Sequence, residues 1–147
     1  MSDNHSEIQE KLFYALKQNR ISDASELLHS LDSDNETFIT FIDNYFSEHG
    51  YKRQFILQKA GIDMSYGYKL LAGAKHTNNR NMILRLFLAL RMSEDEIQKA
   101  LNLYGMKPLN KRDKRDRVIL LAPAYHSDID DIEKWLINLD FEPLFDY

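Results

Sequence analysis

The side-chain types that most often perform acid–base, nucleophilic or metal chemistry are scattered along this chain of 147 residues. It contains no cysteine, which excludes disulfides, thiol nucleophiles and cysteine–zinc sites. No two histidines stand four residues apart, the spacing at which a pair on one helix binds zinc. The histidines are His5, His29, His49, His76 and His126.

The acidic run at Asp128, Asp130, Asp131 and Glu133 has neither the central glycine nor the distal glutamate of a calcium loop. It better suits the start of a helix, where the dipole favours negative charge. The sequence also lacks a glycine-rich phosphate loop. We therefore expect no enzymatic activity, no bound metal and no cofactor.

Positive charge is concentrated in one segment. Residues 50–91 hold eight Lys or Arg against one acidic residue, Asp63, which gives a net charge of +7. The flanking residues 1–49 and 92–147 carry −7 and −4, so the whole chain is −4. Because the local potential governs phosphate affinity more than total charge does, residues 50–91 are the segment expected to approach nucleic acid.

Within this basic segment, two short helices are expected around a tight turn. The first begins at Arg53 and ends at Gly61, and Asp63 is a good N-cap for the second. Gly73 then stands where glycine commonly follows the end of a helix. Two helices joined by about three residues, with a glycine at the break, have the sequence form of a helix-turn-helix.

This stretch resembles the helix-turn-helix of lambda-repressor-like (Cro/Xre-type) bacterial transcriptional regulators. The similarity continues to about Tyr104, and residues 37–144 as a whole resemble one bacterial subgroup of these proteins. Two positions depart from the family pattern: Leu57 replaces a small residue, and Gly67 replaces an aliphatic residue inside the recognition helix. A mid-helix glycine costs about 1 kcal/mol relative to alanine, and we expect it to leave room for Leu57 or Tyr66.

The resemblance implies which residues contact DNA. In this family the recognition helix enters the major groove with its N-terminal residues at base edges. Methionine can touch a thymine methyl group, serine can pair with several bases, and lysine can reach guanine O6 and N7. The base-reading candidates on one helical face are Met64, Ser65, Tyr68 and Lys69, and the phosphate candidates are Arg53, Lys75, Asn78 and Arg80.

Residues 1–35 are expected to form an acidic helical appendage with a net charge of −4. Apolar residues at helical spacing predict helices over residues 6–18 and 22–31, the second capped by Ser22. Two interpretations remain open: the appendage packs on the adjoining domain, or it mediates self-association or binds another protein.

Residues 36–109 are expected to form the five-helix repressor-like domain. A wide apolar stripe predicts its first helix over residues 36–49. The strongly apolar residues 80–92 predict a buried central helix, and Ser93 with Glu96 predicts a capping box at the start of the next helix.

The chain then repeats itself. Residues 93–109 and 128–144 align without gaps at an offset of 35, and Arg80 in the preceding helix corresponds to Arg115. The identical pairs are Asp95/Asp130, Ile97/Ile132, Lys99/Lys134, Leu101/Leu136, Pro108/Pro143 and Leu109/Leu144.

Residues 110–147 are therefore expected to form a second helical hairpin, repeating 80–109, with helices over 113–125 and 129–139. Pro123 should kink or end the first of these helices. The hairpin either packs on the core, with Leu136 buried like Leu101, or forms a dimer surface around Trp135.

The sequence thus predicts an all-α fold with three parts, residues 1–35, 36–109 and 110–147. No apolar run approaches the length of a membrane helix, and the polar N-terminus is unlike a signal peptide, so a cytoplasmic protein without membrane contact is expected. The expected function is sequence-specific binding of double-stranded DNA in transcriptional regulation, as a homodimer. The alternative is a protein-interaction module that keeps the repressor fold without specific DNA binding.

Overall fold

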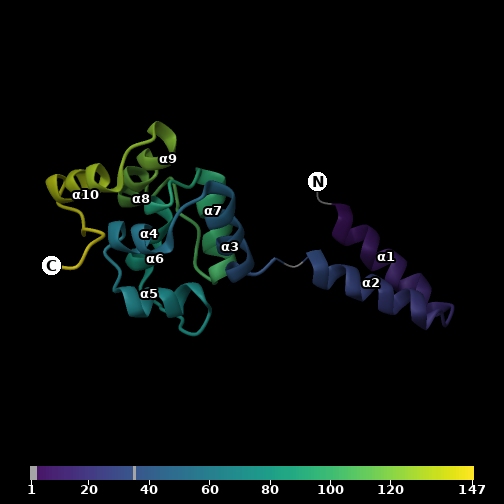
Figure 1. Ribbon diagram of the computed structural model, residues 1–147. Helices are drawn as coiled ribbons and strands as arrows, with labels where there is room; N and C mark the ends of the chain where they lie inside the picture. Colours follow the sequence, from purple (N-terminus) through teal and green to yellow (C-terminus); the bar gives the residue numbers. More distant parts are fainter. Residues whose placement is uncertain (1–2, 35) are drawn as a thin grey trace. The chain divides into compact units, whose positions relative to one another are not determined.

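The computed structural model describes the backbone of residues 3–34 and 36–147, and the side-chain surroundings of residues 7–28 and 36–147. Every regular element in the described residues is a helix, as the all-α prediction requires (Figure 1). The chain divides into two compact units, Met1–Glu36 and Thr37–Tyr147. Among the described helices, none is both long enough and apolar enough to cross a lipid bilayer.

The first unit is a hairpin of α1 (Asp3–Lys17) and α2 (Ile21–Asp34). Its turn places Asn19 in the left-handed region, with φ of 60°, a conformation that asparagine tolerates better than most residues. The carbonyl of Arg20 then accepts a hydrogen bond from Ala24 N at 3.1 Å. The helix therefore starts at Ile21, and the prediction that Ser22 caps it is wrong.

The second unit begins with α3, where Thr37 caps the helix by accepting a hydrogen bond from Thr40 N at 3.1 Å. The helix consequently starts later than the expected residue 36. The predicted capping box of Ser93 and Glu96 is confirmed, with both of its hydrogen bonds present. The helices of this part are α3 (Phe38–His49), α4 (Arg53–Lys59), α5 (Met64–Leu71), α6 (Arg80–Ala89) and α7 (Glu94–Tyr104).

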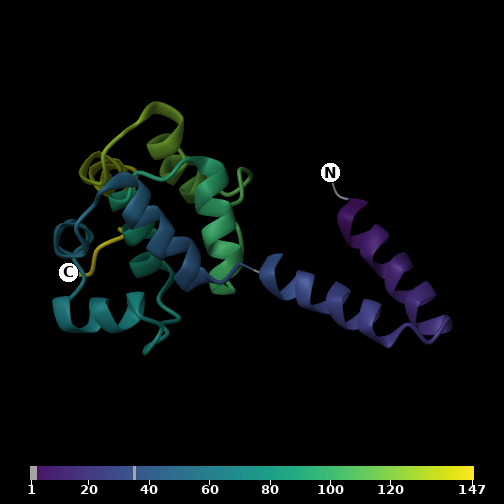
Figure 2. The same cartoon turned by 45° about the vertical axis from the view of Figure 1, so that its right-hand side comes forward.

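The core of the second unit is built around α6. All residues from Ile83 to Leu90 are buried, as expected for the central helix. Figures 1 and 2 both show α3 beside α7, and the two helices are in contact. Phe38 of α3 packs edge-on against Tyr104 of α7, with ring centroids 4.6 Å apart. α4 and α10 also contact α6.

The second hairpin consists of α8 (Lys114–Ile119), α9 (Leu121–Tyr125) and α10 (Ile129–Asn138). The single helix expected over residues 113–125 is thus interrupted at Leu120. Pro123 explains the break, because it has no N–H to donate and its ring crowds the carbonyl four residues earlier, at Ile119. Leu101 and Leu136 are both fully buried, as predicted from the repeat.

The internal repeat is visible in side-chain contacts as well as in sequence. The Arg80 guanidinium donates to the carbonyls of Lys107 and Pro108, at 2.6 and 3.3 Å. Its counterpart Arg115 donates to the carbonyls 35 residues further along, those of Glu142 and Pro143, at 2.8 and 3.4 Å. Each arginine therefore fastens the start of its hairpin to the segment that ends it.

Candidate nucleic-acid interface

The α4–α5 connection is fixed by local hydrogen bonds. Gly61 adopts a left-handed backbone with φ of 66°, a conformation that glycine adopts without strain. Ile62 is buried with 3 % of its surface exposed, and anchors the turn in the core. The Asp63 carboxylate accepts a hydrogen bond from Tyr66 N at 3.0 Å, which caps α5 as expected.

α5 buries one side and exposes the other. Gly67, Leu70 and Leu71 are buried on the inner side. Of the four base-reading candidates, Ser65, Tyr68 and Lys69 are exposed, whereas Met64 is half-buried and packs against the core. The exposed side thus offers a hydroxyl, a phenol and an ammonium group, all able to hydrogen-bond to base edges or phosphates.

Leu57 and Gly67 compensate each other in volume. A Cβ atom built on Gly67 would lie 2.6 and 2.7 Å from the two Cδ atoms of Leu57. Leu57 is fully buried, so it fills the space that a side chain at position 67 would need. Either Leu57 or Tyr66 was expected to fill this space. Leu57 makes the contact, while Tyr66 packs against the core from a partly buried position.

The four phosphate candidates occupy different surroundings. Arg53 is paired with Asp43 at 2.6 Å, and its guanidinium lies 4.7 Å from the centre of the Phe46 ring. Arg80 is half-buried and is held by the carbonyls that end the first hairpin. Lys75 and Asn78 are exposed in the loop after α5.

This loop is anchored at its centre by Tyr104. The Tyr104 hydroxyl accepts a hydrogen bond from Thr77 N at 2.8 Å, and the His76 ring stacks on the Tyr104 ring with centroids 4.3 Å apart. Burial raises the pKa of Tyr104, so its phenol stays neutral near pH 7. Lys75 and Asn78 are therefore displayed from a loop whose middle is tied to the core.

Arg85 could not be recognised from the sequence as a structural residue. It is 2 % exposed, and its guanidinium donates to the carbonyls of Ala60 and Leu144, each at 2.7 Å. Burial lowers its pKa, with Asp146 and Glu133 acting in the opposite direction, and an arginine remains charged at neutral pH. The only sequence signal was its place inside the buried stretch from Ile83 to Leu90.

The C-terminal tail completes the support of the turn. The Phe145 ring lies 5.0 Å from the Arg85 guanidinium, and a Cβ atom on Gly61 would come within 2.9 Å of that ring. Glu133, 6 % exposed, accepts hydrogen bonds from Leu144 N and Phe145 N at 2.6 and 3.2 Å. The second hairpin therefore holds the tail against the α4–α5 turn, which favours packing on the core over a purely interfacial role.

The charge available to a ligand is smaller than the sequence total suggests. Arg85 is buried, and Lys59 and Arg91 both approach Asp128, at 2.9 and 3.7 Å. Among the described residues of the basic segment, the exposed cations that take part in no ion pair are Lys52, Lys69 and Lys75. These stand just before α4, on α5 and just after α5.

The described residues contain no group of three or more His, Cys, Asp or Glu side chains arranged to hold a metal ion. In comparisons with known proteins, no family model, no curated protein and no solved structure matches the chain.

Proposed function

We propose that α4 and α5 form a helix-turn-helix of the lambda-repressor type, with α4 as scaffold helix and α5 as recognition helix. The protein then acts as a non-enzymatic, sequence-specific DNA-binding regulator of transcription. In a helix-turn-helix, the second helix must be packed against the first on one side and present polar side chains on the other. α5 has both properties.

The observation that carries the proposal is the distribution of charge about α5. Lys69 is exposed on α5 itself, while Lys52 and Lys75 stand before α4 and after α5. Exposed cations on a recognition helix and in the segments next to the helix pair suit contacts with DNA phosphates. Ser65 and Lys69 are then the main candidates for base contacts, and Met64 has a smaller part because it is half-buried.

Arg53 and Arg80 remain candidates for phosphate contacts, although both already have partners within the chain. Arg53 already shares its charge with Asp43, and Arg80 is engaged by backbone carbonyls. A phosphate contact from Arg53 would need to compete with a carboxylate at 2.6 Å.

Selection of duplexes from a random-sequence pool tests the proposal. We expect the wild type to enrich a defined sequence. Lys69→Ala should lose preference at one base position per half-site, a loss of about 1–3 kcal/mol. Lys134→Ala is the control, because Lys134 is exposed on α10 and the substitution removes the same charge.

Two results would contradict the proposal. Enrichment of no sequence, together with stable association with another protein, would favour the interaction-module alternative. Equal changes in the selected sequence for Lys69→Ala and Lys134→Ala would show that α5 does not read bases.

A further inference from the structure

The N-terminal hairpin has few fully buried apolar residues among those that the structure describes. In its described part, Ala15 and Ala24 are the buried hydrophobic residues, and both are small. Four larger apolar side chains stay half or more exposed: Phe13 at 57 %, Leu16 at 51 %, Ile21 at 63 % and Leu28 at 50 %. Units below about 40 residues usually need oligomerisation, a metal or a disulfide to be stable. This chain has no cysteine, so it forms no disulfide.

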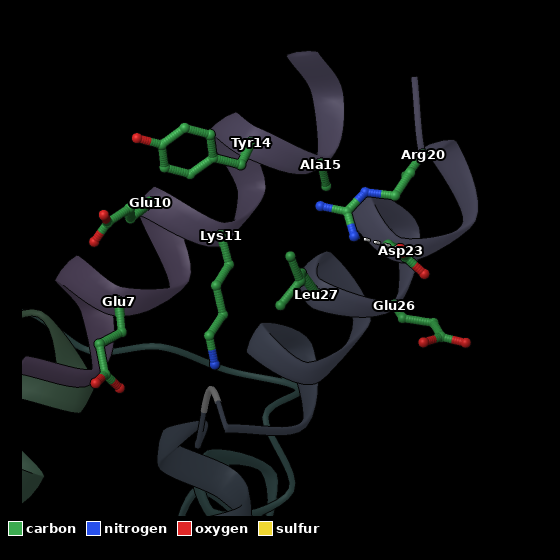
Figure 3. A pocket seen from close by; sticks show the side chains of 9 residues that line it. All are labelled: Glu7, Glu10, Lys11, Tyr14, Ala15, Arg20, Asp23, Glu26 and Leu27. Atoms are coloured by element: carbon green, nitrogen blue, oxygen red, sulfur yellow. Dashed lines mark ion pairs between the residues drawn. The ribbon is translucent and has the colours of Figure 1, made fainter. Parts of the chain in front are cut away.

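The side of the hairpin opposite the apolar residues is charged. Figure 3 shows Glu7, Lys11 and Tyr14 of α1 lining a pocket of about 630 Å³ together with Asp23 and Glu26 of α2. Arg20 and Asp23 form an ion pair at 3.4 Å at the same place. The residues that line this pocket therefore identify which side of the hairpin is charged.

Helical geometry places the large apolar side chains on the other side. Successive residues of an α-helix are about 100° apart around its axis. On α1, Tyr14 precedes the buried Ala15 by one residue and lies on the pocket side, whereas Leu16 follows Ala15 and lies on the opposite side. Phe13 shares the Leu16 row, because it stands three residues earlier.

α2 has the same division. Asp23 precedes the buried Ala24 and lines the pocket, whereas Ser25 follows Ala24. Ile21 and Leu28 stand four residues before and three residues after Ser25, so the three form one row. Each row is reached by advancing one residue past the buried alanine of its helix. Because the two helices are right-handed and antiparallel, both rows lie on the same side of the pair.

The resulting surface combines two rows, one from each helix, and neither row contains a charged residue within residues 7–28, whose side chains the structure describes. They are Gln9, Phe13 and Leu16 on α1, and Ile21, Ser25 and Leu28 on α2. The Lys17 side chain extends along the edge of this surface, and the Lys17 Nζ lies 5.5 Å from the centre of the Phe13 ring. We call these six residues the neutral face.

We propose that the neutral face binds the neutral face of a second copy of this chain, so that two hairpins form a four-helix bundle. The face combines large and small side chains. α1 presents the bulky Phe13 and Leu16, and α2 presents the small Ser25 between Ile21 and Leu28, where the proposed dimer would place a partner's Phe13. A two-fold contact of this kind is closed, so it stops at the dimer.

Charge also favours this arrangement over other pairings of the same hairpins. Residues 1–35 carry −4, which opposes contact between two copies through their charged sides. Contact through the neutral face keeps the carboxylates of Glu7, Asp23 and Glu26 in solvent. An uncharged surface has no electrostatic attraction to a basic or an acidic partner, whereas burial of its apolar side chains stabilises the contact.

The size of the face sets the expected strength. A helix of 15 residues is about 22 Å long, and two helices side by side are about 20 Å wide. Two copies would bury about 900 Å² in total, less than the roughly 1,200–2,000 Å² of standard stable interfaces, so we expect a weak dimer with a dissociation constant in the micromolar range. In the proposed function the bundle would join two α5 helices for a two-fold operator, but the contact is inferred from the hairpin alone.

Sedimentation equilibrium of the full-length chain without DNA tests this inference. The wild type should pass from monomer to dimer over micromolar concentrations. Phe13→Glu should raise the dissociation constant more than about 100-fold, because a symmetric dimer contains the substitution twice. Tyr14→Glu is the matched control, since Tyr14 is 51 % exposed but lies on the charged side, and it should leave the dimer in place.

Ser25→Glu separates loss of contact from loss of folding. Glutamate is a better helix former than serine, so a monomeric Ser25→Glu protein would have lost the contact and not helix propensity. A wild type that stays monomeric throughout the concentration range would overturn the inference and leave either the rest of the same chain or a different protein as the occupant. Equal dissociation constants for Phe13→Glu and Tyr14→Glu would overturn it as well. Because no DNA is present, failure here is distinguishable from failure of DNA binding.

Discussion

Gly67 lies in the middle of α5, where its missing side chain leaves space for Leu57. Gly67→Ala should gain about 1 kcal/mol in helix propensity. It would also force the buried Leu57 to move, since a Cβ atom would stand 2.6 Å from one Leu57 Cδ atom. Overpacking of a closed core costs about 1–3 kcal/mol, so we expect a net loss of stability in urea unfolding.

A double-mutant cycle shows whether the two residues act as a pair. Leu57→Ala alone should cost about 2–5 kcal/mol, because Leu57 is fully buried. The double variant should be more stable than the sum of the single effects predicts, by about 0.5–3 kcal/mol. Additive losses would mean that Leu57 and Gly67 do not compensate each other.

Single residues differ in how far the sequence alone reveals their role. Asp63 and the Ser93–Glu96 box act on backbone groups three residues away, so their roles could be predicted from local spacing. Arg85 acts on Ala60 and Leu144, which are 25 and 59 residues away. The residue type shows that Arg85 is charged but does not show that it is buried. Its charge was therefore included in the net charge of residues 50–91.

At the scale of elements, the internal repeat predicted structure more reliably than the local residue pattern did. It predicted a second hairpin where Val118 to Leu121 alone would also have suited a strand. It could not predict how the tail is held, because the equivalent residues differ. In the first copy, the Gln98 amide contacts both the N–H and the carbonyl of Leu109, at 2.8 and 2.9 Å. In the second, the Glu133 carboxylate can only accept, so it bonds the N–H of Leu144, and Arg85 donates to the Leu144 carbonyl.

The equivalence of the two hairpins predicts similar costs for truncating their central leucines. Leu101→Ala and Leu136→Ala should each lower the free energy of unfolding by about 2–5 kcal/mol, since both leucines are fully buried. Thermal melts at several protein concentrations should show the same loss throughout. A loss for Leu136→Ala that vanishes on dilution would assign the second hairpin to a dimer contact instead.

Asp128 links α10 to the end of α4 and predicts a pH dependence. Burial alone would raise the pKa of its carboxyl group. The hydrogen bonds from Lys59 and Asp130 N and the charges of Lys59 and Arg91 outweigh this and lower the pKa below 3.8. A depressed pKa in the folded state stabilises the protein above the unfolded value, and this stability is lost as pH falls through the folded pKa.

Asp128→Asn should therefore be less stable than the wild type at pH 7, and the difference should shrink below about pH 4. Asparagine remains a good N-cap, so the variant isolates the ion pairs from the cap. Urea unfolding from pH 3 to 7 measures the difference. Glu48→Gln, which changes an exposed carboxylate outside any ion pair of the described residues, is the control. A difference for Asp128→Asn that is independent of pH would contradict the prediction.

At the scale of the whole molecule, the two compact units divide the expected tasks. Thr37–Tyr147 has a continuous core and the lysines about α5, and the described part of Met1–Glu36 has the neutral face and few buried apolar residues. The acidic character of residues 1–35 was evident from composition. Which side of the hairpin is free of charge became clear only from the packing of Ala15 and Ala24.

The central claim, that the α4–α5 pair binds DNA, is tested most directly by the salt dependence of binding to a selected duplex. Each neutralised phosphate contributes a slope of about −0.9 to the logarithm of affinity against the logarithm of salt concentration. With Lys52, Lys69 and Lys75 as contacts, we expect a slope of about −3 per protomer. Replacing all three lysines by alanine should nearly abolish the slope, while Lys134→Ala should leave it unchanged. A flat plot for the wild type, or a slope that survives the triple replacement, would contradict the account.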